Sequence, residues 1–429
     1  MSKNDNAWES LFAKYEILKH IDHDGQFRIT SEQIKEFREP RLMTKFDHRI
    51  NLPELFSKHD LAILPVTRGD YVIAHFDAYH ELEHYDSHIE KVSPPDNIQS
   101  LDYNNIQSEA VALNGAFAAG IIADFLEDDS LIATAAGRMG TGSFCFSISD
   151  KKSKALHSMS VVNAQMEIDA AYEGSTCMAV FEAKLAKREI SEDFMIRQLY
   201  YPFRVWHERI IKPVRPIFFV YSNDVFRLYE YVFEDTYNYS SIHLIRQKNY
   251  SVEDTAISSA DIQNVLNSVT VTSEPNDIPF PQADKFERVI NLCELLDEQD
   301  MNKSEITEEY SFNERQSDYY ANSARYLGLV EKVRKEGKPF YALTENGRKI
   351  IHMNYRNRQL ELCRIILSHE IFRESLTAYF TSGNIPAIQE FMNIMKQHEL
   401  YNVNSEETFR RRASTVRGWI EWIAGLITE

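Results

Sequence analysis

Two strand-like segments joined by a short turn constrain the fold of this chain more than any other stretch. They lie in residues 161–184, VVNAQMEIDAAYEGSTCMAVFEAK, where the glycine and serine of YEGST suit a tight turn. Asp169 ends the first segment, and Glu182 and Lys184 end the second. Successive strand residues point to opposite faces, so Glu182 and Lys184 share one face. A hairpin would therefore bring Asp169 back alongside them.

These three side chains predict a particular chemistry. Two converging carboxylates repel each other unless a cation lies between them, and hard oxygen ligands suit Mg²⁺. Such an ion would hold a phosphate oxygen and lower the pKa of a bound water molecule, while a neighbouring lysine stabilises charge developing on phosphorus. Asp169, Glu182 and Lys184 therefore predict hydrolysis of a phosphodiester. An E-x-K triplet alone more often marks a solvated strand face, but this one directly follows the apolar MAVF of a buried strand.

The chain is too long, at 429 residues, for a single ordinary core. We assign residues 1–100 to an N-terminal α+β domain in which residues 8–20 form an amphipathic helix and LAILPVTRGDYVIAHF is typical of two strands and a turn. This domain could share in DNA recognition through four basic residues, which are Arg38, Arg41, Lys45 and Arg49.

A mixed α/β domain is expected over residues 101–275. Its small-residue helix covers 108–126, and strands are expected at 143–148, 158–168 and 178–184. The helix containing RQLYYPFR carries aromatic residues for its inner face, and PIFFVYS and FRLYEYVF are two further strands.

The last third of the chain is mainly helical. Within residues 280–355, three short helices (285–296, 303–310 and 314–327) precede a strand, a glycine-containing turn and a second strand. Three helices and a two-stranded wing are the outline of a winged-helix domain. Residues 356–429 form a helical extension, and the run FRRR within it could mark a second helix-turn-helix-like module.

The formal net charge of −18 argues against nucleic acid if it is taken alone. Binding depends on where positive charge collects, however, and residues 325–364 hold ten Lys and Arg against four Glu. Winged helices also serve as protein docking modules, but the basic wing favours double-stranded DNA. The expected base and phosphate contacts in this domain are Arg315, Gln316, Tyr319, Asn322 and Arg325 on the third helix, and Lys332, Arg334, Lys335 and Lys338 in the wing.

The four cysteines lie far apart without any C-x-x-C spacing, so neither a zinc site nor a disulfide framework is predicted. The N-terminus lacks a signal-peptide pattern, and no apolar run approaches the length of a membrane span. We therefore expect a cytoplasmic protein without a membrane partner.

The run EID-(12)-EAK, followed by the helix RQLYYPFR, resembles the PD-(D/E)XK nucleases, in particular the type II restriction endonucleases of bacteria. The resemblance is best over residues 108–222. Ile168 stands where the family usually has proline. The resemblance implies an α/β mixed-sheet nuclease core in which Asp169 and Glu182 bind Mg²⁺ and Lys184 assists the water molecule. It also implies a DNA methyltransferase as functional counterpart, and a palindromic target would call for a homodimer.

Four further residues are weaker candidates. Glu109, on the preceding helix, could add a metal ligand, and Glu167, two residues before Asp169, could do so or could face solvent. Gln198 resembles the helix glutamine found beside the site in some branches of the family, although an internal hydrogen bond is equally compatible. The glycine-rich loop TAAGRMGTGSF favours Arg138 slightly as a DNA contact.

Two rival functions stay open. A repair or recombination nuclease would keep the same site but recognise DNA structure rather than sequence. A winged-helix DNA-binding regulator would have a non-catalytic α/β domain, although the presence of Asp169, Glu182 and Lys184 counts against it. A glycosidase is disfavoured because its paired carboxylates explain neither the basic wing nor Lys184.

Overall fold

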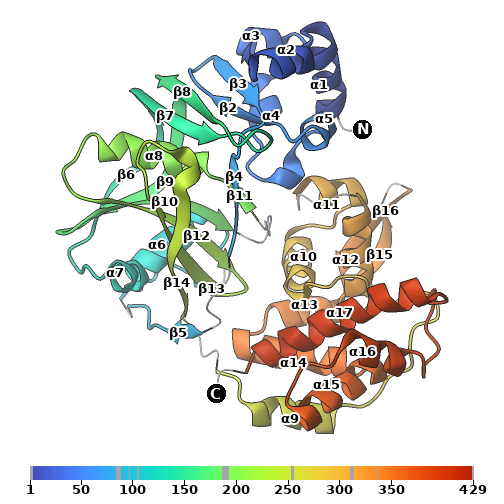
Figure 1. Cartoon of the computed structure of the whole chain (residues 1–429). Coiled ribbons are helices and arrows are strands. Elements are labelled where there is room, and N and C mark those ends of the chain that lie inside the picture. Colours follow the sequence, from blue (N-terminus) through green and yellow to red (C-terminus); the bar gives the residue numbers. More distant parts are fainter. Residues whose placement is uncertain are drawn as a thin grey trace.

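A computed structural model describes residues 3–83, 88–95, 97–103, 106–185, 193–252, 256–309, 314–335 and 337–427. The chain is a mixed α/β protein that contains a seven-stranded mixed sheet. Figure 1 shows three units in chain order: an N-terminal unit, the unit with the large sheet, and a C-terminal helical unit. In that view the sheet lies at the left, below the N-terminal unit, and the C-terminal helices α14, α15 and α17 lie to its lower right.

The N-terminal unit packs short helices on a three-stranded antiparallel sheet of order β1-β3-β2. The helix expected over 8–20 is two helices, because Glu16 has a left-handed backbone (φ 47°) that interrupts the turn. Thr30 and Gln33 form a capping box at the start of α3. The elements are α1 Lys3–Lys14, α2 Ile17–Asp24, β1 Gln26–Thr30, α3 Ser31–Lys35, α4 Pro40–Thr44, η1 Arg49–Asn51, α5 Glu54–Lys58, β2 Ala62–Pro65 and β3 Asp70–Ala74.

The large sheet has the strand order β5-β14-β13-β12-β10-β9-β6. Its central neighbours β10 and β12 run parallel, and β9 returns antiparallel to β10. Its strands are β5 Ile89–Lys91, β6 Ile132–Gly140, β9 Gln165–Glu173, β10 Met178–Leu185, β12 Val214–Ser222, β13 Val225–Phe233 and β14 Ile242–Ser251. The other elements of this unit are β4 Tyr79–Glu81, α6 Glu109–Ala118, α7 Ile121–Leu126, β7 Ser143–Ser149, β8 Leu156–Val162, β11 Asp193–Met195, α8 Arg197–His207 and η2 Tyr239–Ser241. Helix α9 Ser259–Ser268, which was expected in this unit because residues 101–275 were assigned to it, packs instead on α14 in the core of the C-terminal unit.

Three sequence-based expectations for this unit were wrong in detail. The glycine-rich segment around Arg138 is not a loop but the edge strand β6, and its two register shifts accommodate Gly137. The strand expected over 158–168 is two strands, β8 and β9, which are separated at the left-handed Asn163. The helix expected over 108–126 is interrupted at Gly120, whose φ of 77° suits glycine.

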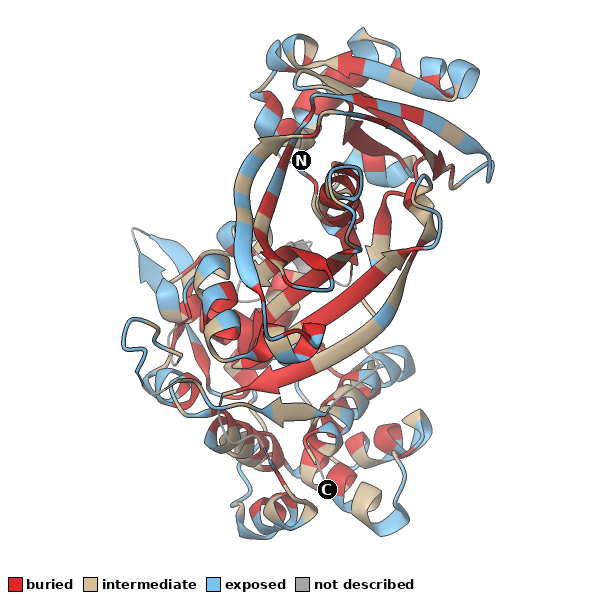
Figure 2. Ribbon diagram, turned by 90° about the vertical axis from the view of Figure 1, so that its left-hand side faces the viewer, coloured by how far each residue is buried: buried red, intermediate tan, exposed pale blue. Residues whose placement is uncertain are grey.

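Helices cover both faces of the large sheet. The aromatic residues of α8 pack with Phe218 and Tyr229 on one face, whereas α6 and α7 pack against Phe181, Ala183 and Phe219 on the other. Figure 2 shows the resulting buried residues along the central strands. Because side chains alternate along β10, the residues next to Phe181 and Ala183 point toward the α8 face.

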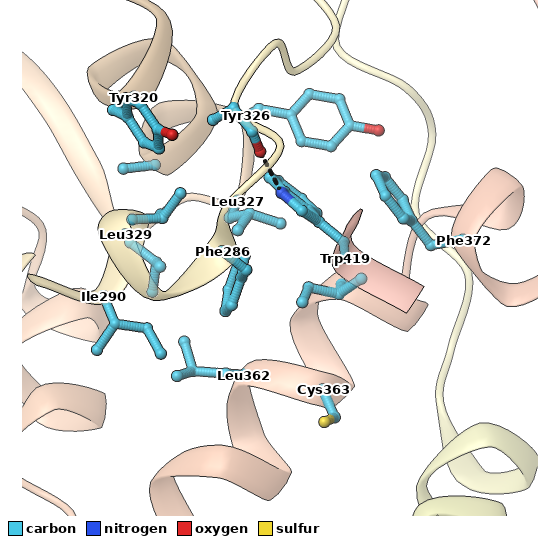
Figure 3. Close-up of a cluster of buried hydrophobic side chains, with 14 of the residues drawn as sticks. Phe286, Ile290, Tyr320, Tyr326, Leu327, Leu329, Leu362, Cys363, Phe372 and Trp419 are labelled. Carbon is cyan, nitrogen blue, oxygen red and sulfur yellow. Dashed lines mark hydrogen bonds between the residues drawn. The ribbon is translucent and has the colours of Figure 1, made fainter. Parts of the chain in front are cut away.

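The C-terminal unit has one helical core, and part of it is shown in Figure 3. Trp419 lies in this core and donates a 2.6 Å hydrogen bond from Nε1 to the carbonyl oxygen of Ala283. The elements are α10 Phe286–Glu298, α11 Lys303–Glu309, α12 Glu314–Tyr326, β15 Val330–Lys335, β16 Lys338–Leu343, α13 Glu345–Ile351, α14 Tyr355–Leu367, α15 Glu370–Ser382, α16 Ile388–Met395 and α17 Glu406–Gly425. No helix among the described residues is both long and apolar enough to cross a membrane.

A buried polar contact joins the C-terminal unit to the sheet. The β12–β13 turn contains Asn223 and Asp224, both with positive φ (52° and 57°), as a tight hairpin turn requires. Arg358 of α14 donates hydrogen bonds to Asn223 Oδ1 (2.6 Å) and Asp224 Oδ2 (2.7 Å), and Gln359 also donates to Asn223 Oδ1. The two units are therefore held together by side-chain hydrogen bonds as well as by the connecting chain.

Asp150, at the end of β7, provides a test of stability against pH. Burial by itself would raise the pKa of Asp150. The hydrogen bonds from the backbone N–H of Ser153 and from the ring of His157 outweigh this effect and lower the pKa to about 2. A folded-state pKa below the ordinary 3.8 stabilises the fold while the carboxylate is ionised. We expect Asp150→Asn to lower the free energy of unfolding at pH 7, and the difference from wild type to shrink as the pH falls from about 4 to 2. Urea unfolding across this pH range measures the difference, and a gap independent of pH would contradict the assignment.

Candidate functional site

The β9–β10 hairpin brings together the acidic and basic residues that the sequence singles out. Phe181 pairs with Ala170, so the next position of β10, Glu182, lies beside Asp169 of β9. The carboxylate of Asp169 accepts a 2.7 Å hydrogen bond from the backbone N–H of Ala183, which fixes its orientation. The expected hairpin is present, although Asp169 lies within β9 rather than at its end.

Glu182, which is buried, and Lys184, which is largely buried, form a pair on the α8 face of the sheet. Lys184 Nζ lies 2.7 Å from Glu182 Oε1, and the two side chains are 13% and 9% exposed. The side-chain amide of Gln198, at the start of α8, donates a hydrogen bond to the same oxygen atom. This contact is consistent with both suggestions for Gln198, since it is an internal hydrogen bond and lies within the site.

Burial and charge act on the pKa values of these groups. Burial raises the pKa of Glu182 above its ordinary range, opposed by Lys184 and reinforced by Asp169. Burial also raises the pKa of Asp169, opposed by its hydrogen bond from Ala183. Burial alone would lower the pKa of Lys184, but Glu182, Asp47 and Glu109 together raise it, so the ammonium group is cationic at neutral pH.

The three residues open onto a cavity of about 1080 Å³ that the N-terminal unit shares. Glu109, Arg138, Glu167 and Gln198, named from the sequence, also line it, as do Arg41 and Lys45. Arg138 Nε lies 3.5 Å from Glu167 Oε2, and both side chains are at least half exposed. The structure thus gathers all the candidates from the sheet unit around one cleft.

Asp47 is a residue of this cleft that sequence reasoning missed. It follows α4 in the N-terminal unit, and its Oδ1 is buried without a hydrogen-bond partner in the described part of the chain. Burial opposes ionisation of Asp47, but Lys184, Lys45 and Arg197 keep its pKa below the ordinary value. No motif surrounds Asp47 in the sequence, so only the tertiary fold reveals its place.

The donor set suits a hard divalent cation. Asp169 and Glu182 offer carboxylate oxygens, and the raised pKa values of both indicate that a neighbouring positive charge would favour their ionised forms. Among the residues that the structure describes, no three His, Cys, Asp or Glu side chains form a preassembled metal cage. Mg²⁺ commonly binds through one or two carboxylates and keeps several water ligands, so this arrangement fits Mg²⁺ better than a fully protein-ligated metal.

The candidate DNA contacts of the C-terminal unit have mixed exposure. On α12, Gln316, Tyr319, Asn322 and Arg325 are all partly buried, and Arg325 donates a 3.0 Å hydrogen bond to Asn322. The side chain of Arg315 lies outside the described residues.

The basic residues of the β15–β16 hairpin are all exposed. Lys335 forms an ion pair with Asp300 at 2.8 Å, and Lys332 lies over the ring of Tyr341. Arg334 and Lys338 form no ion pair within the described part of the chain. These two cations are therefore the wing residues most available to a ligand.

Comparison with known proteins divides the chain into three matched segments. Family models match residues 5–73 (DUF6996), 74–251 (DUF6997) and 288–428 (DUF7226). Each describes a domain of unknown function. No curated protein and no solved structure matches the chain. The cleft is lined by residues of both the first and the second matched segments.

Proposed function

We propose that this protein is a Mg²⁺-dependent DNA endonuclease of the PD-(D/E)XK kind, acting as a type II restriction enzyme. The observation that carries the proposal is the convergence of Asp169, Glu182 and Lys184 at one open cleft. An antiparallel hairpin places the carboxylates side by side, and a third charged group is fixed two residues further along β10. A solvated strand face would not bury Glu182 and leave Asp169 and Lys184 only partly exposed.

Each residue has a separate role in this proposal. Asp169 and Glu182 would hold Mg²⁺, which supplies Lewis-acid stabilisation of the phosphate and a more acidic water molecule. The N–H of Ala183 and the amide of Gln198 orient the two carboxylates. Lys184 stays protonated among its acidic neighbours and can therefore stabilise negative charge that develops on the phosphate.

The C-terminal unit supports DNA as the substrate. Helices α10, α11 and α12 precede the antiparallel β15–β16 hairpin, which matches the outline of a winged helix. The fixed contact of Arg358 with the sheet would give such a reading unit a constant position relative to the cleft. A palindromic target would require two copies of the chain, because one site cuts one strand.

Incubation of the purified protein with mixed plasmid DNA and Mg²⁺, followed by sequencing of the fragment ends, tests this function. We expect discrete fragments whose ends share a short sequence. Cleavage confined to branched or damaged DNA would support the repair or recombination nuclease instead. Sequence-specific binding without any cleavage would support the non-catalytic regulator.

The wing gives a second test. We expect the double variant Arg334→Gln/Lys338→Gln to bind cognate and random DNA more weakly, because phosphate contacts carry no sequence information. Two lost contacts should reduce the slope of log affinity against log salt by roughly 1.8 units. Lys335→Gln is the matched control, because Lys335 is already paired with Asp300 and should change the slope less. Fluorescence anisotropy measures both, and equal slopes for wild type and the double variant would remove the wing from the interface.

A further inference from the structure

The N-terminal unit forms one wall of the cleft that contains Asp169, Glu182 and Lys184. Its contribution comes from α3, α4, the segment after α4, and the β2–β3 turn. The opposite wall comes from β6, β9, β10 and the start of α8. Any molecule that reaches the candidate catalytic residues through this cleft therefore lies against both units.

The N-terminal wall carries cations that are free to meet a ligand. Lys35, Arg41 and Arg68 are exposed, line the cleft, and form no ion pair within the described residues. On the opposite wall, Lys184 is paired with Glu182 and Arg138 with Glu167, while Arg197 is only partly exposed and lies over the ring of Tyr201. Positive charge is therefore available to a ligand on this wall, although the chain as a whole has a net charge of −18.

The N-terminal wall is fixed relative to the sheet unit. The carbonyl oxygen of Asp47 accepts a 2.9 Å hydrogen bond from the N–H of Met195, and the buried ring of His48 lies 2.6 Å from the carbonyl oxygen of Asp193. Further along, Tyr201 donates from its hydroxyl group to the carbonyl oxygen of Pro65 at 2.8 Å. The positions of the three cations relative to the candidate catalytic residues are thus set by the fold.

We propose that the N-terminal unit binds the DNA backbone, with Lys35, Arg41 and Arg68 contacting phosphates that flank the bond to be cut. This inference rests on the proposed nuclease function and assigns the substrate contacts to a different unit from the wing. Phosphate is the matching ligand because exposed Lys and Arg side chains bind it without requiring a particular base. With the flanking phosphates bound in this way, the DNA backbone would place one phosphate next to Asp169, Glu182 and Lys184.

The same wall carries two exposed acidic residues, Glu32 and Glu39, that line the cleft. Their negative charge repels DNA. The proposal therefore predicts that substitutions of the acids and of the cations on this wall change DNA affinity in opposite directions. Removal of the cations should weaken DNA binding, whereas removal of these acids should strengthen it.

The test measures binding of a random-sequence DNA duplex by fluorescence anisotropy, in Ca²⁺ and in an Asp169→Asn background to prevent cleavage. We expect Lys35→Gln/Arg41→Gln/Arg68→Gln to reduce the salt slope by roughly 2.7 units. When salt is raised from about 50 to 200 mM, the affinity of the parent should therefore fall by a factor roughly 40 times larger than the affinity of this variant does. Glu32→Gln/Glu39→Gln should bind more tightly than the parent. The matched control is Lys3→Gln/Lys91→Gln/Lys154→Gln, which removes three exposed cations outside the cleft and should leave the slope nearly unchanged.

The outcomes separate this inference from the function on which it rests. If the wild type cleaves plasmid DNA but the cleft triple variant, with an unchanged melting temperature, keeps the parent's salt slope, the N-terminal wall does not bind the backbone. An equal loss of slope in the control triple variant would also overturn the inference, because the effect would then be one of net charge. If the wild type neither binds nor cleaves DNA at low salt, the proposed function itself fails.

Discussion

Replacement of Asp169, Glu182 or Lys184 by alanine should abolish DNA cleavage while DNA binding remains measurable. The carboxylates would be the metal ligands, and Lys184 the cation that meets charge on the phosphate. Removal of one such preorganised group typically lowers the rate by about 10²–10³-fold or more. The proposed binding surfaces lie on the wing and the N-terminal wall, so binding in Ca²⁺ should persist.

Glu173→Gln is the matched control for this prediction. Glu173 belongs to the same hairpin as Asp169, but it pairs with Lys212 at 2.7 Å and does not line the cleft. The Glu173→Gln variant should therefore cleave DNA at the wild-type rate. Retained cleavage by Asp169→Ala would exclude the proposed site, whatever the control variant does.

Arg358→Ala should produce the largest loss of stability among single substitutions between the units. The Arg358 side chain is 4% exposed, and its removal would leave Asn223 and Asp224 without their main partner. Loss of one member of a buried ion pair typically costs about 3–5 kcal/mol. We expect about 3 kcal/mol here, because Asp224 is 23% exposed and keeps some contact with solvent. Urea unfolding measures the change.

Arg356→Ala is the matched control, which tests whether the loss of stability comes from the buried contact of Arg358 or from the removal of any paired arginine on α14. Arg356 lies two residues earlier on α14 and pairs with Asp261 in a contact where both side chains are about one third exposed. Such surface pairs contribute at most about 1 kcal/mol, so this variant should be much more stable than Arg358→Ala. Similar losses for both would show that the contact with the β12–β13 turn adds nothing specific.

The parts of the fold that depend on neighbouring residues could be predicted from the sequence. The β9–β10 hairpin needs only alternation, a tight turn and two apolar strands, and it alone places Asp169 beside Glu182. The helices and the two-stranded hairpin of residues 286–343 likewise follow their local patterns. The sequence alone therefore predicts that Asp169, Glu182 and Lys184 lie together.

The other wall of the cleft could not be predicted in this way. Asp47 reaches the site because its backbone pairs with Met195, almost 150 positions later, and no local pattern records that contact. Strand β6 is not predicted for a different reason. Its glycines favour a loop, whereas cross-strand pairing with β9 makes the segment a strand. The partial burial of α12 also depends on tertiary packing, so its four described candidates are less accessible than helical spacing suggests.

The pairing of β10 with β12 has a mechanical consequence. Lys184 of β10 pairs with Val220 of β12. The turn to which Arg358 donates its hydrogen bonds begins only three residues after Val220. At about 3.3 Å per residue, the C-terminal unit is anchored roughly 10 Å along the strand from the level of Lys184. Because this separation is short and the contact of Arg358 is buried, we expect a displacement of α14 to move the β12–β13 turn and, with it, the strands beside the cleft.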